Sequence, residues 1–397
     1  MASPAETVAP ATAEPGWLIE RRRRGASLAA ELELPTRKTK GWEFTDLSDF
    51  EPASFSEERA SVEGIEADGE GGVVVMALAD AFETHGELLR ERMGSLVEVD
   101  DPFVALNEAG LHDGLFVYVP RGRRLDEPVQ VEVGQSGEDS AVNWRTVVIV
   151  EEGAEAEVWE RYSSEGAGLF NGVVELFVGP AATLRYVCQQ DLSERTWAFA
   201  TQRASVDRDA SLEWVALGFG SERGKVRMET RLVGRGASAK VTGAMAGGGS
   251  QHLDYDTTQE HSAEDTSSDL AFRGVLAERS TSVWRGMIEV DRGAQRTDAF
   301  QESRNLLLSP TAHADAIPGL EILADDVRCT HAAAIAQVDP DQLFYLRSRG
   351  MDDGDAKGLV IGGFLQELVE RASEGPIREL LAERLETRLD QLLATTK

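Results

Sequence analysis

The residues best suited to chemistry lie near the C-terminal end of the sequence. Residues 309–339 combine histidines and carboxylates with one of the chain's two cysteines, and Cys329 and His331 stand two positions apart. If this segment is a strand, the two side chains share one face. A thiolate and an imidazole on one face can both bind a soft or borderline metal such as iron or zinc. Because two ligands do not complete a metal site, a partner chain or labile ligands would supply the rest. The alternative is a buried thiol beside a hydrogen-bonded histidine.

Other motifs carry less weight. His252 and His261 lie among carboxylates in residues 251–265, and strand alternation would place some of these groups on one face, but a metal site there is the less favoured interpretation. The nearest approach to a P-loop, residues 218–226, lacks the glycine spacing and has Val226 where a Mg²⁺-binding Ser or Thr would stand. The sequence also has no GxSxG, HExxH or CxxC motif. We therefore expect a chain that is not itself an enzyme.

Residues 120–335 are short β-branched runs separated by tight polar turns, and one corner recurs in them. A strand ends, a short turn closes with Gly or Asp, and an alternating strand follows; Gly and Asp suit such turns because they tolerate positive φ or cap their own backbone. The corners fall 26–30 residues apart, at positions 126, 153, 179, 209, 236, 265 and 293. Two strands of about seven residues and two corners fill this period, which predicts one coil of a β-solenoid, whereas a four-strand propeller blade needs more. The repeat predicts strands that end at Val150, Val206, Val233 and Val290. Val150 and Val206 should then lie at stacked corners two coils apart.

An antiparallel meander is the alternative, since such corners also suit hairpins. The glycine-rich residues 243–250 inside this region are predicted to form a flexible loop.

Composition and patterning divide the chain into four segments. Residues 1–16 are predicted to be a disordered tail, 17–119 an N-terminal helical and mixed domain, 120–335 the solenoid core, and 336–397 a C-terminal helical domain. The last helix carries one apolar stripe, formed by Ile377, Leu380, Leu381, Leu385, Leu389, Leu392 and Leu393. A solenoid needs caps, and its open edges can pair with another chain, so helices at both ends are expected to cap it. The stripe would either join the core or dock a partner.

The charge balance excludes several classes of protein. The 397 residues carry 70 acidic against 40 basic side chains, a net charge of −30, so nucleic-acid binding is not expected, and Arg21–Arg24 is interpreted as a solvated helix face. No apolar run is long enough for a membrane span, and the first residues do not resemble a signal peptide. Cys188 and Cys329 alone cannot form a disulfide framework, which fits a reducing cytoplasm. Cys188, among apolar neighbours, is expected to be an inert core thiol.

A resemblance to a known family extends over much of the chain and is strongest over about 250–370. Residues 305–351, NLLLSPTAHADAIPGLEILADDVRCTHAAAIAQVDPDQLFYLRSRGM, resemble the C-terminal region of SufD-type members of the SufB/SufD family, which serves iron–sulfur cluster assembly in the SUF system. Three further stretches are similar to the same family: KGWEFTDL (40–47), QHLDYDTTQEH (251–261) and RGVLAERSTSVWRGMIEV (273–290). The ADDVRCTHAAA block is the most specific part.

Details of this block favour the SufD branch over the SufB branch. SufD proteins typically have Ser between the cysteine and the histidine and Gly after the histidine, where this chain has Thr330 and Ala332. Both changes are small and keep the Cys–His pair. SufB-type members usually carry other residues at this block, and often an N-terminal cysteine-rich motif that this sequence lacks.

The resemblance implies a mainly β fold, a right-handed parallel β-helix flanked by N-terminal and C-terminal α-helical domains. It also implies a heterodimer with SufB through the β-helix edges and docking of the ATPase SufC on the C-terminal helices, residues 341–397. The missing P-loop agrees with an ATPase motif on SufC. At the family positions that match Cys329 and His331, a nascent iron–sulfur cluster is thought to form near the SufB interface. Such a cluster is transient and shared with SufB, and the isolated chain need not retain it.

Three functions are therefore weighed. The first is a non-catalytic scaffold subunit for iron–sulfur cluster assembly, of SufD type or, as the alternative, of SufB type. The second is a carbohydrate-active β-helix enzyme, which would be expected to have a carboxylate cleft or Ca²⁺ site and a secretory signal. The third is an interaction-only solenoid. Purification with SufB-like and SufC-like partners separates the first from the other two.

Overall fold

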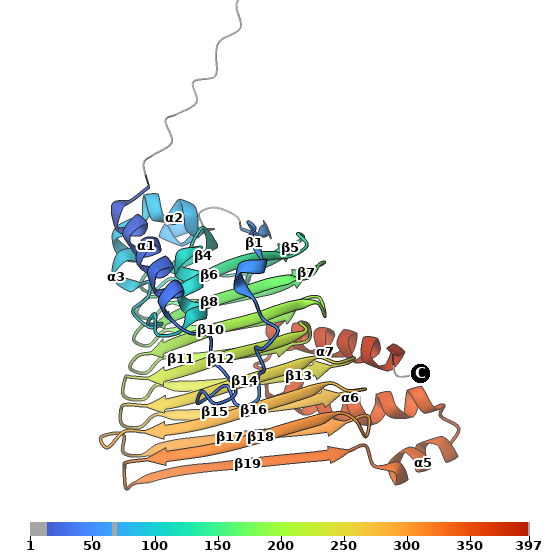
Figure 1. The fold of residues 1–397 in the computed structure, drawn as a ribbon. Coiled ribbons are helices and arrows are strands. Elements are labelled where there is room, and N and C mark those ends of the chain that lie inside the picture. The colour runs from blue at the N-terminus through green and yellow to red at the C-terminus, as the bar shows by residue number, and fades with distance from the viewer. Residues whose placement is uncertain (1–13, 66–69, 396–397) are drawn as a thin grey trace, which may run out of the picture.

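A computed structural model describes residues 14–65 and 70–395, so most of the predicted disordered tail, residues 1–13, lies outside the described residues. The chain is a β-solenoid with helices beside it (Figure 1). The main helices are α1 (Gly16–Glu31), α2 (Leu78–Thr84), α3 (Gly86–Arg92), α4 (Pro102–Ala109), α5 (Pro340–Ser348), α6 (Asp353–Arg371) and α7 (Pro376–Thr395). Among these residues no helix combines the length and the apolar character that a membrane crossing requires.

The strands form two sheets, and the chain alternates between them. The ten-stranded sheet contains β1 (Ser56–Glu57), β3 (Val74–Ala77), β4 (Asp113–Val119), β6 (Ser140–Val150), β8 (Gly168–Val178), β10 (Thr196–Val206), β12 (Arg223–Leu232), β14 (His252–His261), β16 (Thr281–Val290) and β18 (His313–Ile322). The nine-stranded sheet contains β2 (Ser61–Glu63), β5 (Val129–Gln135), β7 (Glu155–Ser164), β9 (Thr183–Asp191), β11 (Ser211–Gly218), β13 (Ser238–Gly247), β15 (Ser267–Leu276), β17 (Thr297–Leu307) and β19 (Val327–Gln337).

Strand pairing confirms the solenoid. Val150 pairs with Val178, and Val178 pairs with Val206, so the two predicted corners are stacked two coils apart. From β4 and β5 onward every paired strand in the described residues is parallel; only β2 on β5 and β3 on β4, at the N-terminal end, pair antiparallel. A meander would show antiparallel neighbours throughout, so that alternative is wrong.

The corners repeat because the backbone of each one includes a residue in the left-handed conformation. After each strand of the larger sheet from β4 to β16, one residue has positive φ: Gly122, Gly153, Ala181, Asp209, Gly236, Asp265 and Arg296. In the middle coils this residue donates its N–H to the corner of the next coil, as from Gly153 to the Pro180 carbonyl at 2.9 Å. The predicted anchors at 153, 209, 236 and 265 are these residues, whereas those at 126, 179 and 293 miss the left-handed position by a few residues.

Two local predictions are wrong because the coils differ in length and packing. Leu232, and not Val233, pairs with Val206, so Val233 lies in the corner and is 40% exposed. Residues 243–247 belong to strand β13, not to a flexible loop. Gly243 is needed there because a Cβ would lie 2.3 Å from the Phe272 ring.

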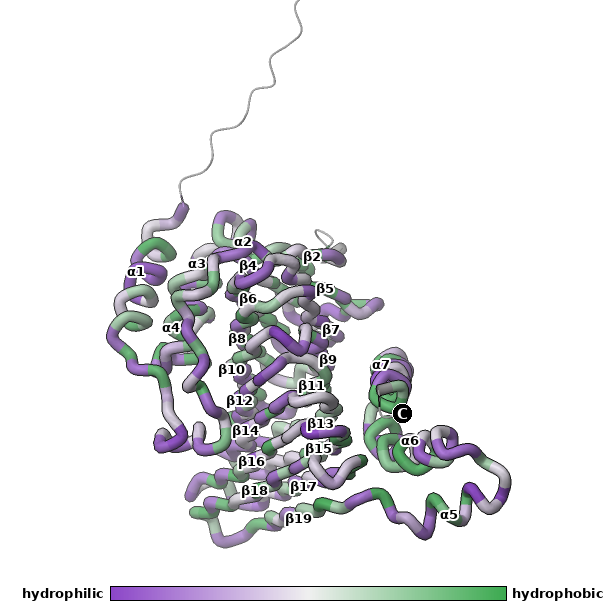
Figure 2. The backbone as a smooth tube through the Cα atoms, turned by 45° about the vertical axis from the view of Figure 1, so that its right-hand side comes forward, coloured by the Kyte–Doolittle hydropathy of each residue, from purple (hydrophilic) through white to green (hydrophobic). Residues whose placement is uncertain are grey.

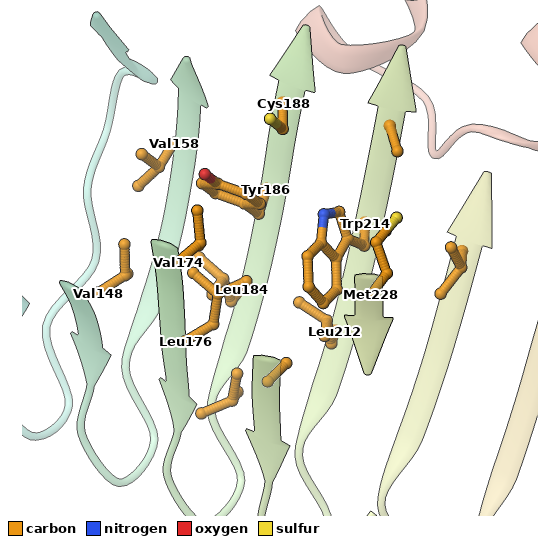
Figure 3. Close-up of a cluster of buried hydrophobic side chains, with 14 of the residues drawn as sticks. Val148, Val158, Val174, Leu176, Leu184, Tyr186, Cys188, Leu212, Trp214 and Met228 are labelled. Carbon is orange, nitrogen blue, oxygen red and sulfur yellow. The ribbon is translucent and has the colours of Figure 1, made fainter. Parts of the chain in front are cut away.

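The core of the solenoid lies between the two sheets. Side chains from both sheets point toward each other, with Tyr186 and Trp214 opposite Val174 and Met228 (Figure 3). Inward positions stack in columns, because parallel neighbours keep their register from coil to coil. One column runs from Trp214 through Val241, Leu270 and Gln301 to the last strand.

Buried charges attach the N-terminal helices to the outer face of the larger sheet. Arg145, fully buried, donates to Glu108 at 3.0 Å and to Glu175 at 2.8 Å, and Arg21 also pairs with Glu108. Arg22 donates to the Leu111 carbonyl at 2.7 Å. Half of the arginine run is therefore engaged with the protein itself, which corrects its interpretation as a solvated face.

The C-terminal helices do not cap the solenoid. α6 and α7 lie along the outer face of the smaller sheet (Figure 2). The predicted apolar stripe is buried there, with Leu381 and Leu385 packed in one cluster with Val215, Leu217 and Val275. The stripe therefore covers the protein's own sheet, and no other described segment caps the coil of β18 and β19.

His261 is a buried histidine whose protonation opposes folding. Its side chain faces inward from β14, fully buried, with Nδ1 2.8 Å from the Thr266 hydroxyl and Nε2 2.9 Å from the Ser268 hydroxyl. Burial lowers the pKa of His261 to about 4. Between that pKa and the unfolded value of about 6.5, the unfolded chain binds the proton and the folded chain does not.

We therefore expect the free energy of unfolding to fall as the pH falls from about 6.5 to 4, with His261 accounting for up to about 3 kcal/mol. His261→Gln should remove this part of the pH dependence, although it should also lower stability at neutral pH. Urea unfolding at pH 7 and pH 4.5 measures the effect, with His313→Gln, on an exposed histidine, as control. An equal pH slope in wild type and His261→Gln would contradict this assignment.

Candidate functional site

The last coil of the solenoid is its most exposed part. β18 pairs only with β16 and β19 only with β17 among the described residues, so each sheet ends in an unpaired edge. Half of the residues of β18 and most of those of β19 are exposed. Several apolar side chains of this coil are 37–53% exposed: Ile317, Leu320, Ile322, Leu323 and Ile335.

Cys329 and His331 lie on one face of β19, and that face is the inward one. Cys329 is in register with Ala299, and His331 with Gln301, both buried in β17. These positions continue the columns that hold Leu212 and Trp214 in the middle coils. Because no further coil covers them, Cys329 is half-buried and His331 is exposed.

The environment of Cys329 favours the protonated thiol. Burial against Val290 and Ala299 raises its pKa, and the nearby Asp298 carboxylate raises it further, while the Ala299 backbone lowers it. A metal ion binds the thiolate, so it would have to displace this proton. The His331 imidazole makes no hydrogen bond to another described residue, which leaves it able to reach a ligand beyond the coil.

The pair fits the donor preferences of iron but does not enclose it. Thiolate sulfur and imidazole nitrogen both suit iron and zinc. In the part of the chain that the structure describes, no group of three or more His, Cys, Asp or Glu side chains is placed to hold a metal ion. The rest of the polar cluster in 309–339 is not gathered here: His313, for example, pairs with Asp315 at 3.1 Å on the outward face of β18. A cluster at this coil would need ligands from elsewhere.

His252 and His261 do not form a site together. They lie on opposite faces of β14, and each imidazole contacts hydroxyls at both nitrogens. His252 Nε2 lies 3.2 Å from the Thr45 hydroxyl and Nδ1 2.7 Å from the Thr281 hydroxyl, and burial lowers its pKa.

Sequence reasoning missed a polar cluster on the outer face of the larger sheet, where residues 40–47 cross it. Lys225 and Asp254, both nearly fully buried, form an ion pair at 3.0 Å, and Thr45 donates to Asp254 at 2.6 Å. Glu43 pairs with Arg285 at 2.7 Å. Residues 40–47 and the stretches that contain Asp254 and Arg285 all show the family resemblance. Nothing in the spacing of these stretches indicates that residues about 200 positions apart are in contact. This cluster fixes the N-terminal segment across the solenoid.

Cys188 differs from Cys329 in how accessible its thiol is. It is buried in the middle of the solenoid, where burial and the Glu160 carboxylate raise its pKa to about 12. A thiol in this state is neither a nucleophile nor a metal ligand at neutral pH. It fits the expected role of a core side chain.

A second exposed surface lies on the C-terminal helices. α5 buries no residue, and Phe344 and Tyr345 are 71% and 56% exposed. Leu359 of α6 is 56% exposed. Large apolar side chains gathered on a surface commonly mark an interaction site.

Comparisons with known proteins agree with these features. Residues 133–364 match the family model of the SufBD core domain of SUF-system FeS cluster assembly, and residues 54–131 match that of the SufBD protein N-terminal region. The iron–sulfur cluster assembly protein SufD of Bacillus subtilis is 30% identical over 93% of both chains. An iron–sulfur cluster assembly SufBD family protein of Staphylococcus epidermidis is 29% identical over 75% of this chain and 65% of its own length. The chain therefore belongs to the SufBD family of SUF-system iron–sulfur cluster assembly proteins and is SufD-like.

Proposed function

We propose that the chain is a non-catalytic scaffold subunit that pairs with a SufB-type protein through its last coil and docks a SufC-type ATPase through its C-terminal helices. The observation that carries the proposal is the uncapped coil of β18 and β19, whose inward face presents Cys329 and His331. At the N-terminal end the antiparallel strands β3 and β2 border the first parallel strands, whereas among the described residues no strand follows β18 or β19.

The open coil has the properties of an interface between solenoids. Two unpaired edges leave backbone N–H and C=O groups without ladder partners, and proteins usually cover such edges or blunt them. The exposed apolar side chains between the edges, such as Leu320 and Ile335, would be buried by a partner that continues the stack. A second solenoid can pair with the two edges and bury these apolar side chains at once, because it can extend each sheet and close the interior.

The nascent cluster would be cargo held at this junction. Cys329 and His331 supply one sulfur and one nitrogen donor, and the partner supplies the remaining ligands. Incomplete ligation by each chain suits a cluster that must be released to a recipient. The low thiolate content of Cys329 at neutral pH keeps binding dependent on a metal strong enough to displace its proton.

The ATPase surface is better assigned to α5 than to the apolar stripe of α7. Docking through the stripe is not favoured, because its leucines already pack on the smaller sheet. α5 leaves Phe344 and Tyr345 outside any core, and aromatic side chains are frequent binding hot spots. Deleting 341–397 would expose the sheet face, so substitutions on α5 are the cleaner test.

We expect the chain, coexpressed with the SufB-type and SufC-type proteins of its own genome, to copurify with both. His331→Ala should leave the yield of the complex unchanged, because an exposed side chain is removed, and should lower its iron–sulfur absorbance severalfold. Cys329→Ser should lower it more mildly. His313→Ala, on the outward face of the same coil, is the control. Wild-type absorbance in the His331→Ala complex at equal yield would show that the pair is structural.

Phe344→Ser and Tyr345→Ser should each weaken ATPase binding by about tenfold, the effect of losing an aromatic hot spot. Neither should change pairing with the SufB-type partner, because Phe344 and Tyr345 belong to α5 and not to the β18 or β19 edge. Ile19→Ser, on an N-terminal apolar side chain of similar exposure, is the matched control. Titration of the ATPase by calorimetry gives the affinities. Unchanged affinity in both α5 variants would show that the ATPase docks on another surface.

A further inference from the structure

Charged side chains on the outward faces of the sheets form ladders that alternate in sign. The clearest ladder crosses five strands of the smaller sheet, in register, through Glu157, Arg185, Glu213, Lys240 and Asp269. On the larger sheet, Arg203 faces Glu229. Opposite charges directly across neighbouring strands stabilise a sheet, and like charges destabilise it.

On the larger sheet one ladder breaks this rule, and it does so toward the open end. Arg231 of β12 pairs with Glu260 of β14 at 2.8 Å, but the next two positions are Glu289 of β16 and Glu321 of β18. Three carboxylates therefore stand in register on neighbouring strands. Among the described residues no cation forms an ion pair with Glu289 or Glu321. Burial raises the pKa of Glu289, and the Glu260 and Glu321 carboxylates raise it further.

The run ends at the edge of the sheet. Glu321 is exposed on β18, whose outer edge is unpaired, so the next position of the ladder belongs to whatever strand pairs with β18. The other carboxylate on the outward face of this strand, Asp315, already contacts His313. A cation at the next position would face Glu321 directly and restore the alternation seen elsewhere.

We propose that the partner strand that pairs with β18 carries a Lys or Arg directly opposite Glu321, so that the ladder continues across the interface. The inference rests on the proposed pairing through the last coil and adds the charge that fixes the partner's register there. It holds for a parallel or an antiparallel partner strand, since either places one residue opposite Glu321. The competing explanation is that Glu321 only prevents edge-to-edge pairing of copies of this chain.

Charge reversal at Glu321 separates the two explanations. With the SufB-type protein of the same genome, Glu321→Lys should weaken binding by about tenfold at low salt, because a pair is replaced by repulsion. The loss should shrink in 0.5 M salt as screening increases. The affinity of Glu321→Gln should lie between the affinities of the wild-type chain and of Glu321→Lys. Glu127→Lys makes the same charge change on an exposed side chain at the other end of the solenoid and should bind like wild type.

Replacing the partner's edge Lys or Arg by Glu should restore binding to Glu321→Lys. Wild-type affinity in Glu321→Lys would overturn the inference while leaving the proposed pairing intact. If the Glu321 variants bind the SufB-type protein with wild-type affinity and Glu321→Gln newly self-associates, the inference is overturned, and Glu321 serves to prevent edge-to-edge pairing. If the wild-type chain does not bind the SufB-type protein at all, the proposed function fails, and the inference fails with it.

Discussion

The outermost strands of a parallel β-solenoid lack a hydrogen-bonding neighbour on one side, and the rest of the molecule depends on how each end meets this constraint. Each strand satisfies the backbone groups of its neighbours, so a solenoid always has a first and a last coil with unpaired edges. At the N-terminal end the chain adds β2 and β3 as antiparallel end strands, and its helices pack on the outer face of the larger sheet beside them. At the other end it supplies nothing among the described residues, because α6 and α7 lie along the side of the stack. This asymmetry between the two ends is the reason for proposing the C-terminal end of the solenoid as the assembly surface.

The two cysteines show how position in the stack determines chemistry. Cys188 and Cys329 occupy strands of the same sheet, but Cys188 lies where coils cover it on both sides, and its thiol cannot ionise at neutral pH. Cys329 lies where only one side is covered, so a ligand can reach it. The same edge that leaves backbone groups unpaired also exposes the inward face of β19, so the candidate donors and the proposed assembly surface coincide.

Sequence patterns correctly predicted the structural features that depend on short-range repetition along the chain. The recurring corner revealed the coil because a positive-φ residue is needed once per turn, and strand alternation put Cys329 and His331 on one face. Errors arose where coils differ by a residue, as at Val233, or where packing gives glycine another role, as at Gly243. Long-range contacts left no signal: the ion pair of Lys225 with Asp254 under Thr45, and the placement of α7 on the sheet, depend on surfaces that exist only after the coils have stacked.

The central claim is that the uncapped coil is the surface through which this chain assembles with a SufB-type protein. Amide hydrogen exchange of the isolated chain and of the complex tests it most directly. The account predicts fast exchange along β18 and β19 in the isolated chain and strong protection of both strands in the complex, with the middle coils unchanged. Protection confined to other elements, with β18 and β19 still exchanging fast in the complex, would contradict it.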